Sequence, residues 1–405
     1  MKKQALHTIF IVLPLLFLCF CHMENRPAQT PVLPPSAPIP PGHTEPVVME
    51  QPSLKLHASG ACLMDAASGR ILYGKEEAAP LPMASTTKIM TCLLALEHGN
   101  LNDTVTFSAR AASMPKVHLG ASAGSSFTLE DLLYSLMLES HNDTAVAIAE
   151  HVGGSVEGFA GPMNTKAAEL GMSQTHFVTP NGLDADGHAS TPADMCRLAA
   201  YACQNESFLQ IIQTPSRTIR DTSGRRTYSL SNKDAFLTSY DGALGIKTGF
   251  TGKAGYCFVG AARRENRTFT TCVLASGWPP DKSWKWADTK KLMDFGFENF
   301  TFQHIPLQNL SSVRIAVEDG RAATVGITTP EIPDQLLSPF DSIDIEYRLP
   351  ERLKAPVRTD MAAGSIEVSV NGTPSGSYAV YPLDNIEKTT LMDVCMYIAG
   401  LFFNF

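Results

Sequence analysis

The chain has 405 residues, enough for two domains with short appendages at either end. Hydrophobic residues make up 44% of it and charged residues 18%, as in an ordinary globular protein. The formal net charge of -8 argues against a nucleic-acid-binding protein, which would need a basic face or stripe.

Residues 1–23 are predicted to be a secretory signal peptide. Two lysines stand near the N-terminus, and residues 9–21 form an apolar run interrupted by a single proline. Such a run is shorter than the ~20 residues that a membrane span needs, but it suits the core of a signal peptide. The proline-rich residues 24–53 then predict an extended linker. We therefore expect the protein to be secreted.

Seven of the nine cysteines lie beyond the signal peptide, and an odd number excludes a complete disulfide framework. Cys196 and Cys203 are too far apart along a predicted helix to form a disulfide. Cys257 and Cys272 could face each other across a hairpin that turns near residues 264–266, or remain buried thiols. No cluster of cysteines and histidines has the spacing of a metal site.

Residues 54–300 are predicted to form a mixed α/β domain. Residues 60–64 and 70–73 flank a turn-like segment, residues 65–69, and are predicted to form a hairpin. Apolar alternation predicts two further strands over residues 255–262 and 268–276. Apolar residues at helical spacing predict helices over residues 86–98, 128–138, 191–203 and 283–297.

Capping residues support two of these helices. Thr128 followed by Asp131 resembles a capping box, in which the threonine side chain binds the N–H group three residues on. Thr191 and Pro192 supply a cap and a first-turn proline for the next helix.

Residues 301–386 are predicted to form a small all-β domain, because the apolar period changes to two after Pro306. Alternating apolar residues predict strands near residues 313–317, 343–349 and 366–370, and Asn371-Gly372 is a strong turn signal. The domain contains no constellation of residues that suggests chemistry.

Residues 387–405 are predicted to form an amphipathic helix. Asp393, Gly400 and Asn404 fall on one helical face, and the remainder is largely apolar. The segment is too short to span a bilayer comfortably, so we expect it to lie in the interface at the outer face of the membrane. The alternative is a helix docked on the protein's own surface.

The first motif that suggests chemistry is Ser85-Thr86-Thr87-Lys88, at the start of a predicted helix. Residues i and i+3 share a helix face, so Lys88 can bring its amine to the Ser85 hydroxyl. A lysine that burial and nearby cations keep neutral can act as the base for a serine nucleophile. The helix N-terminus adds N–H groups that stabilise an oxyanion.

Two further motifs follow at longer range. In Ser140-His141-Asn142, Ser140 would offer a second hydroxyl for proton transfer, and Asn142 would bind Lys88 or the substrate amide; the alternative is a pair of capping residues. In Lys247-Thr248-Gly249, the cation and the hydroxyl could bind a carboxylate, and Gly249 leaves room for a substrate backbone. Alone, this tripeptide could equally be a surface turn.

The order Ser-x-x-Lys, Ser-x-Asn, Lys-Thr-Gly resembles the signature set of the penicillin-binding proteins and related β-lactamases. Five longer segments are similar to the low-molecular-mass D-alanyl-D-alanine carboxypeptidases, and the resemblance covers about residues 54–299. The five segments are Met83–Thr91, Ser140–Ala145, Phe177–Leu183, Ser190–Met195 and Gly245–Thr251.

The resemblance implies an α/β (α+β) transpeptidase-like fold, followed by a small all-β domain and a C-terminal amphipathic helix. It implies Ser85 as the nucleophile and Lys88 as the base of an acyl-enzyme reaction that removes the terminal D-alanine from peptidoglycan stem peptides. β-Lactam antibiotics would then act as inhibitors, with no metal or organic cofactor and no nucleic acid involved.

The other implied site residues bind and orient the substrate. Ser140 joins the proton network, and Asn142, Lys247 and Thr248 hold the peptide and its carboxylate. Gly249 and Phe250 lie beside the peptide, and the N–H groups of Ser85 and Phe250 form the oxyanion hole. His141 stands where the family more often has glycine, and could narrow the cleft, tune the pH dependence or point to solvent.

Three rival functions remain. A β-lactamase of class A would need a glutamate to activate the deacylating water, and residues 173–190 contain Asp184 and Asp186 but no glutamate. An endopeptidase that cuts cross-links is barely separable by sequence. An inactive wall-binding scaffold is disfavoured because every expected catalytic position is filled.

Overall fold

The computed structural model describes residues 49–403, so the predicted signal peptide and most of the predicted linker lie outside the described residues. The α/β part is built on a five-stranded antiparallel sheet with the strand order β2-β1-β9-β8-β7. Its strands are β1 Gly60–Asp65, β2 Ile71–Lys75, β7 Ala243–Thr251, β8 Gly255–Arg264 and β9 Arg267–Leu274.

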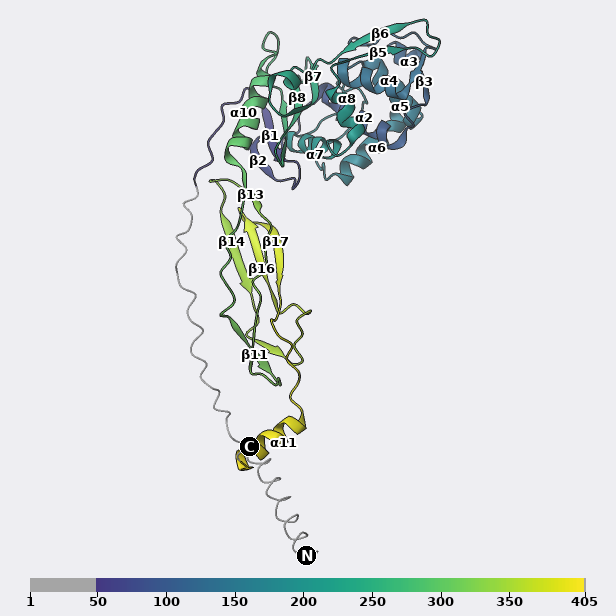
Figure 1. Ribbon diagram of the computed structural model, residues 1–405. Helices are drawn as coiled ribbons and strands as arrows, with labels where there is room; N and C mark the ends of the chain where they lie inside the picture. Colours follow the sequence, from purple (N-terminus) through teal and green to yellow (C-terminus); the bar gives the residue numbers. More distant parts are fainter. Residues whose placement is uncertain (1–48, 404–405) are drawn as a thin grey trace, which may run out of the picture. The chain divides into compact units, whose positions relative to one another are not determined.

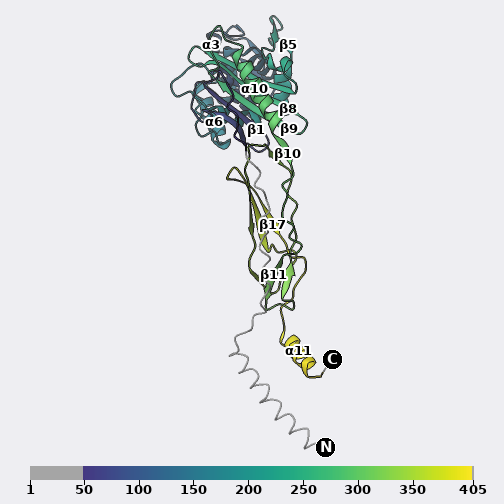
Figure 2. The ribbon, with the colours of Figure 1, turned by 90° about the vertical axis from the view of Figure 1, so that its left-hand side faces the viewer.

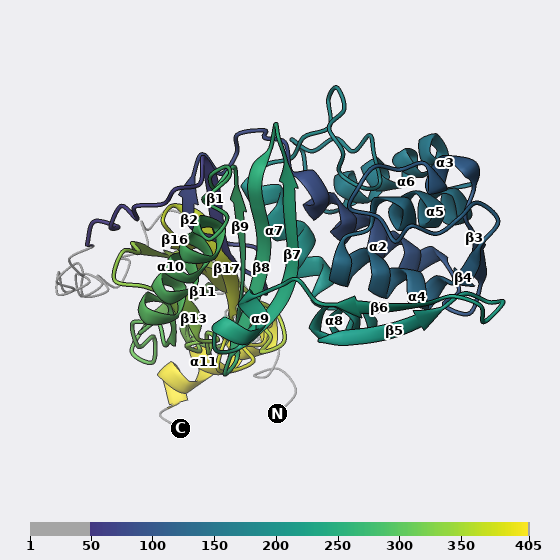
Figure 3. The same cartoon turned by 90° about the horizontal axis from the view of Figure 1, so that it is seen from above.

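Both faces of this sheet are covered, because successive side chains of a strand point to opposite faces. Helix α10 (Trp284–Asn299) covers one face, where Leu63 and Val273 pack in a core with Leu292. Helix α7 (Pro192–Ala202) packs against the other face. Figure 2 shows α10 lying in front of the strands, and Figure 3 shows the strands between α10 and the helical region around α2.

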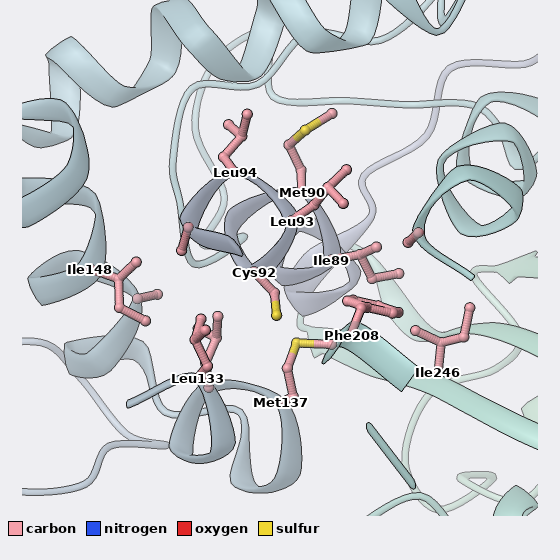
Figure 4. Packing of buried hydrophobic residues seen from close by; sticks show 14 of the residues in the cluster. Ile89, Met90, Cys92, Leu93, Leu94, Leu133, Met137, Ile148, Phe208 and Ile246 are labelled. Carbon is pink, nitrogen blue, oxygen red and sulfur yellow. The ribbon is translucent and has the colours of Figure 1, made fainter. Parts of the chain in front are cut away.

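The helical region surrounds α2 (Lys88–His98), the helix that follows the first motif (Figure 1). All residues of α2 from Lys88 to Ala95 are buried. Figure 4 shows the apolar side chains of α2 packed against neighbouring elements, with Ile89, Met90, Cys92, Leu93 and Leu94 labelled. The helical region also contains α3 Ala109–Ala112, α4 Leu129–Tyr134, α5 Asn142–Gly153, α6 Val156–Glu169 and α8 Glu206–Gln213. The short helix α9 (Phe236–Ser239) lies beside β7 instead, with Phe236 in the core on the α10 side of the sheet (Figure 3).

Short elements complete this part of the fold. A 3-10 turn, η1 (Ala84–Thr87), precedes α2, and a π-helical turn, η2 (Ser135–Glu139), follows α4. Two two-stranded sheets lie among the helices: β3 Thr104–Thr106 with β4 Ser126–Thr128, and β5 Ser216–Arg220 with β6 Thr227–Ser231.

The predicted caps are present. Thr128 accepts a hydrogen bond from the Asp131 N–H group at 3.2 Å and begins α4. Thr191 accepts one from the Asp194 N–H group at 3.1 Å, with Pro192 as the first residue of α7. The helix predicted over residues 128–138 is correct in place but changes to the π-helical turn at Ser135.

Between α10 and the C-terminal helix α11 (Leu391–Phe403) the chain is all-β, as predicted. One three-stranded sheet has the order β14-β16-β17 and another the order β12-β11-β15, while β10 pairs with β13. Their strands are β10 Thr301–Gln303, β11 Arg314–Glu318, β12 Thr324–Gly326, β13 Gln335–Leu337, β14 Ile343–Arg348, β15 Arg352–Lys354, β16 Gly364–Val370 and β17 Thr373–Val380.

These strands enclose their own apolar core, which includes Ile315, Val325, Ile366 and Val368. The Asn371-Gly372 turn forms where it was predicted, with φ values of 52° and 72°. Such positive φ values are those of a tight hairpin turn.

Helix α11 (Leu391–Phe403) ends the described chain. The apolar side chains of Leu391, Met396 and Leu401 are 71%, 62% and 67% exposed. Asp393 accepts hydrogen bonds from Thr390 and forms an ion pair of 3.0 Å with Arg321. Among residues 49–403, no helix is both long and apolar enough to cross a membrane.

The possibility that Cys257 faces Cys272 is wrong. The hairpin between β8 and β9 pairs Arg264 with Arg267, so its turn lies one residue later than expected and the register shifts by two. Val259 therefore lies opposite Cys272 in β8, and Cys62 lies opposite Cys272 in β1. All seven cysteines of the described region are free, and six of them are buried.

Candidate active site

Ser85 lies in the strained turn that leads into α2. The preceding residue, Ala84, has a φ of 48°, a conformation that costs free energy for any residue with a side chain. The turn is held by the Thr86 and Thr87 hydroxyls, which donate to the carbonyls of Met83 and Ala84 at 2.6 and 2.8 Å. Ser85 itself is half-buried at the start of the helix.

Lys88 is fully buried one turn after Ser85. Its Nζ lies 2.8 Å from Ser85 Oγ, 2.9 Å from Asn142 Oδ1 and 2.6 Å from the carbonyl oxygen of Asn181. An ammonium group would donate to all three oxygens. A neutral amine would donate to the Asn142 and Asn181 oxygens and keep its lone pair for the Ser85 hydroxyl proton.

The surroundings favour the neutral amine. Burial, and then the positive charge of Lys247, hold the pKa of Lys88 well below its usual value, while the charge of Asp143 acts in the opposite direction. Both main effects are those expected for a lysine that acts as a base.

The Asn181 carbonyl is a contact of Lys88 that sequence reasoning missed. The sequence marks its segment, Phe177–Leu183, only through resemblance, because a backbone oxygen leaves no residue signature. Gly182, with a φ of 80°, brings this loop against the turn before Ser85. A Cβ atom on Gly182 would lie 1.9 Å from the Ala84 carbonyl oxygen, so no other residue fits without moving the loop.

Ser140 and Asn142 reach the site from the end of η2. Ser140 is left-handed, with a φ of 66°, and directs the chain from the π-helical turn into α5. Asn142 donates through Nδ2 to the Pro115 carbonyl at 3.1 Å while its Oδ1 accepts from Lys88. The structure thus joins Asn142 to the Ser85–Lys88 pair by a direct contact, whereas Ser140 is brought to the same region by the backbone alone.

Lys247, Thr248, Gly249 and Phe250 lie on β7, the edge strand of the sheet, where it passes the Ser85 turn. A Cβ atom on Gly249 would lie 3.0 Å from the Met83 carbonyl oxygen and 3.1 Å from the Ser85 nitrogen, so the glycine permits this close approach. Lys247 is 2% exposed and donates to the Thr248 carbonyl at 3.1 Å. The ring of Phe250 is exposed and packs on Tyr256.

Asp234 is a second residue that sequence reasoning missed. Its Oδ1 accepts from the Phe236 N–H group at 2.9 Å, while its Oδ2 is buried without a hydrogen-bond partner. Burial raises the pKa of Asp234 to about 7, and the charges of Lys247 and Lys285 act against this rise. Burial also lowers the pKa of Lys247 to about 8, and the charge of Asp234 opposes it.

His141 does not point to solvent. It is buried, and its Nδ1 lies 2.8 Å from the Ser135 hydroxyl, which in turn lies 2.9 Å from the Thr144 hydroxyl. Burial lowers the pKa of His141 to about 4, so the ring is neutral at ordinary pH. The side chain therefore connects η2 to the start of α5, directly before Asn142.

Within residues 49–403, no three histidine, cysteine, aspartate or glutamate side chains are grouped so that they could hold a metal ion. The geometry at Ser85 is that of a serine and a buried lysine placed for acyl transfer.

Comparison with known proteins identifies the family of the chain. A family model described as D-alanyl-D-alanine carboxypeptidase, peptidase S11, matches residues 46–277. The chain belongs to this family.

Individual relatives extend the similarity. The D-alanyl-D-alanine carboxypeptidase DacF of Bacillus subtilis is 29% identical over 340 residues, which cover 82% of this chain and 86% of the relative. A solved mutant of a Streptomyces DD-transpeptidase is 33% identical, with a TM-score of 0.57 over 61% of this chain and all of the neighbour.

A third likeness shows the fold over more of the chain. The crystal structure of DacD from Francisella tularensis, at 21% identity, has a TM-score of 0.66 over 86% of this chain and 98% of its own. The predicted fold class and the predicted serine-type D-Ala-D-Ala carboxypeptidase activity are thereby confirmed.

Proposed function

We propose that Ser85 is the nucleophile and Lys88 the general base of this carboxypeptidase, acting on peptidoglycan pentapeptide stems. The observation that carries the proposal is the contact of 2.8 Å between Lys88 Nζ and Ser85 Oγ, with two other oxygens to hold the amine in place. Ser85 Oγ attacks the carbonyl carbon of the penultimate D-alanine as its proton passes to Lys88. Collapse of the intermediate releases the terminal D-alanine, and water then hydrolyses the ester on Ser85.

The remaining site residues have supporting roles in this proposal. The N–H groups of Ser85 and Phe250 would bind the oxyanion, and Ser140 would pass the proton toward the leaving amine. Lys247 and Thr248 would bind the terminal carboxylate of the stem, since a buried ammonium and a hydroxyl together suit that anion. Asn142 would hold Lys88 and the substrate amide.

One experiment tests both the reaction and the carboxylate recognition. The soluble enzyme is incubated with a pentapeptide stem and, separately, with the same stem as its C-terminal amide, and the products are identified by mass. We expect loss of one D-alanine from the acid and little change in the amide. Efficient turnover of the amide would favour the endopeptidase alternative, and no turnover of either would favour the inactive scaffold.

The β-lactamase alternative predicts rapid release of penicillin. The two acids of residues 173–190, Asp184 and Asp186, are both exposed, and Asp184 accepts from the Thr251 hydroxyl at 2.9 Å. Neither is buried beside Ser85, so we expect the penicilloyl adduct to be long-lived. Multiple-turnover hydrolysis of penicillin, faster than turnover of the peptide, would overturn this part of the proposal.

We also propose that the mature enzyme is extracytoplasmic and is attached to the outer face of the membrane through α11. The exposed apolar side chains of Leu391, Met392 and Tyr397 support this proposal, because exposed apolar side chains on a terminal helix favour the membrane interface over water. The ion pair between Arg321 and Asp393 ties the polar side of the helix to the all-β region.

A further inference from the structure

We propose that the hydrogen bond between Thr87 and His188 positions the Asn181 carbonyl at Lys88, so that both residues support catalysis without touching the substrate. The inference rests on the proposed role of Lys88 and deepens it. Thr87 precedes the base in sequence, whereas His188 ends the loop that supplies the carbonyl. The two side chains are buried and lie 2.9 Å apart, from Thr87 Oγ1 to His188 Nε2.

The other contacts of His188 show which group donates in the Thr87–His188 hydrogen bond. Nδ1 accepts from the Val178 N–H group at 2.9 Å, and therefore carries no proton. Burial lowers the pKa of His188 to about 4, so the ring is neutral and its single proton is on Nε2. Nε2–H therefore donates to Thr87 Oγ1, and the Thr87 hydroxyl donates to the Ala84 carbonyl at 2.8 Å.

These hydrogen bonds hold the loop segment from Val178 to His188 against the turn that carries Ser85. The His188 ring joins the two ends of the segment, because it accepts from the Val178 N–H group, and it also binds Thr87 in the turn. In the middle, the Pro180 carbonyl accepts from the Thr91 hydroxyl at 2.6 Å. Between these anchors the Asn181 carbonyl reaches Lys88 Nζ at 2.6 Å and Ser85 Oγ at 3.3 Å.

The Asn181 carbonyl matters because it determines which way the Lys88 amine points. A neutral amine has two protons, and donation to Asn142 and Asn181 leaves the lone pair directed at Ser85. If the loop moved, one proton would lose its acceptor and the amine could rotate. Misplacement of reacting groups by about 1 Å can cost on the order of 10²-fold in rate.

The test uses substitutions that remove one hydroxyl and little else. Thr87→Val keeps the side-chain shape and removes the partner of His188. Thr86→Val is the matched control, because Thr86 is also buried in the same turn and donates only to the Met83 carbonyl. Thr87→Ser keeps the hydroxyl and removes only the methyl group. The rate of acylation by penicillin is measured by intact mass, with melting temperatures for all variants.

We expect Thr87→Val to be acylated at least about tenfold more slowly than the native enzyme, because Lys88 is no longer oriented. Thr86→Val should lose clearly less activity than Thr87→Val, because it breaks only the bond to the Met83 carbonyl and leaves the bond to His188 intact. Thr87→Ser should stay within about threefold of the native rate, since it keeps the hydroxyl. Equal losses in Thr86→Val and Thr87→Val, or none in either, would overturn the inference. If the native enzyme is not acylated at all, the proposed function fails instead.

The pH profile separates positioning from general destabilisation. The groups whose charges face Lys88 are Lys247 on β7 and Asp143 on α5, and both stay in place in these variants. Loss of the Asn181 acceptor disfavours the ammonium form and lowers the pKa of Lys88 further. The acid limb of acylation should then move to lower pH in Thr87→Val, with a lower plateau. An unchanged limb would contradict the inference.

Substitution of the other partner, His188, gives an independent check. His188→Gln removes the ring that bridges Thr87 and Val178, so we expect the same slow acylation and the same shift of the acid limb. Because both substitutions remove the shared Thr87–His188 bond, the loss in the double variant should be well below the product of the two single losses. Additive losses would mean that the two residues act separately. His188→Gln carries the test if Thr87→Val does not fold.

Discussion

At the scale of single residues, the site depends on one buried amine being neutral. Lys88 has no exposed surface, and Lys247 adds a second positive charge close enough to lower its pKa. Protonation of Lys88 removes the lone pair that would accept the Ser85 proton. Acylation should therefore fall as the pH falls through the lowered pKa of Lys88, rather than near the usual lysine value.

The first prediction tests this pair. Ser85→Ala should form no penicilloyl adduct in an intact-mass measurement, because the nucleophilic oxygen is absent. Acylation of Lys88→Ala should be slower than that of the native enzyme by a factor of ~10² or more, as expected for loss of a general base. Lys291→Ala, which removes an exposed lysine from α10, serves as the control and should match the native rate. An adduct of native yield on Ser85→Ala would assign the nucleophile elsewhere.

The second prediction concerns Asp234 and substrate affinity. The negative charge of Asp234 raises the pKa of Lys247, which burial holds at about 8. Asp234→Asn removes that charge, so Lys247 should lose its proton at lower pH. The KM for a stem with a free carboxylate should then begin to rise at lower pH than in the native enzyme, with kcat less affected.

The control for this prediction is Asp344→Asn, which makes the same change of charge at an exposed position on β14. Its pH profile of KM should match that of the native enzyme. Superimposable profiles for Asp234→Asn and the native enzyme would show that Asp234 does not influence Lys247.

At the scale of elements, the sequence predicts those parts whose signals are local. The helices α4 and α7 are readable because a cap, a first-turn residue and an apolar period coincide. The candidate residues Ser85, Lys88 and Asn142 are readable because their side chains carry the chemistry, and the structure brings these three into contact.

Other parts could not be predicted because they depend on long-range packing. The left-handed Ser140 follows a π-helical turn whose residues, Ser135–Glu139, continue the helical pattern without interruption. The unpaired Oδ2 of Asp234 results from burial, which no local pattern reveals. The register error at Cys272 shows that a turn misplaced by one residue moves every cross-strand pair by two.

The third prediction tests how the loop around Gly182 meets the Ser85 turn. Gly182→Ala introduces a Cβ atom 1.9 Å from the Ala84 carbonyl oxygen, so the loop must move and the Asn181 carbonyl with it. We expect acylation by penicillin to fall on the order of 10²-fold. Gly187→Ala is the matched control: its φ of 78° is similar, but the nearest atom to its Cβ would be 3.7 Å away.

Both variants bear the strain of a side chain at positive φ, so a comparison of their melting temperatures and acylation rates isolates the contact. Equal acylation of the two variants would show that the loop can retreat without disturbing Lys88.

At the scale of the whole molecule, the described chain separates chemistry from attachment. The α/β part contains Ser85, Lys88 and Lys247, whereas the all-β region has its own, separate apolar core. Attachment at the C-terminus would leave the catalytic part free of any direct role in membrane binding. The two functions should therefore be separable by truncation.

The last prediction makes that separation. Fully burying a Leu-sized side chain contributes about 1.5–3 kcal/mol, and α11 exposes several such groups, although partial immersion will reduce the sum. The flanks of α11 are poor in lysine and arginine, with Lys388 nearby, so binding should be mainly hydrophobic and should resist high salt.

Cells expressing the chain with and without residues 389–405 are fractionated, and penicillin acylation is measured in each fraction. We expect the full chain in the membrane fraction at both low and high salt, and the truncated chain in the soluble fraction with native acylation. Equal membrane recovery of both forms would point to an N-terminal anchor, and full solubility of the long form would favour a helix docked on the protein itself.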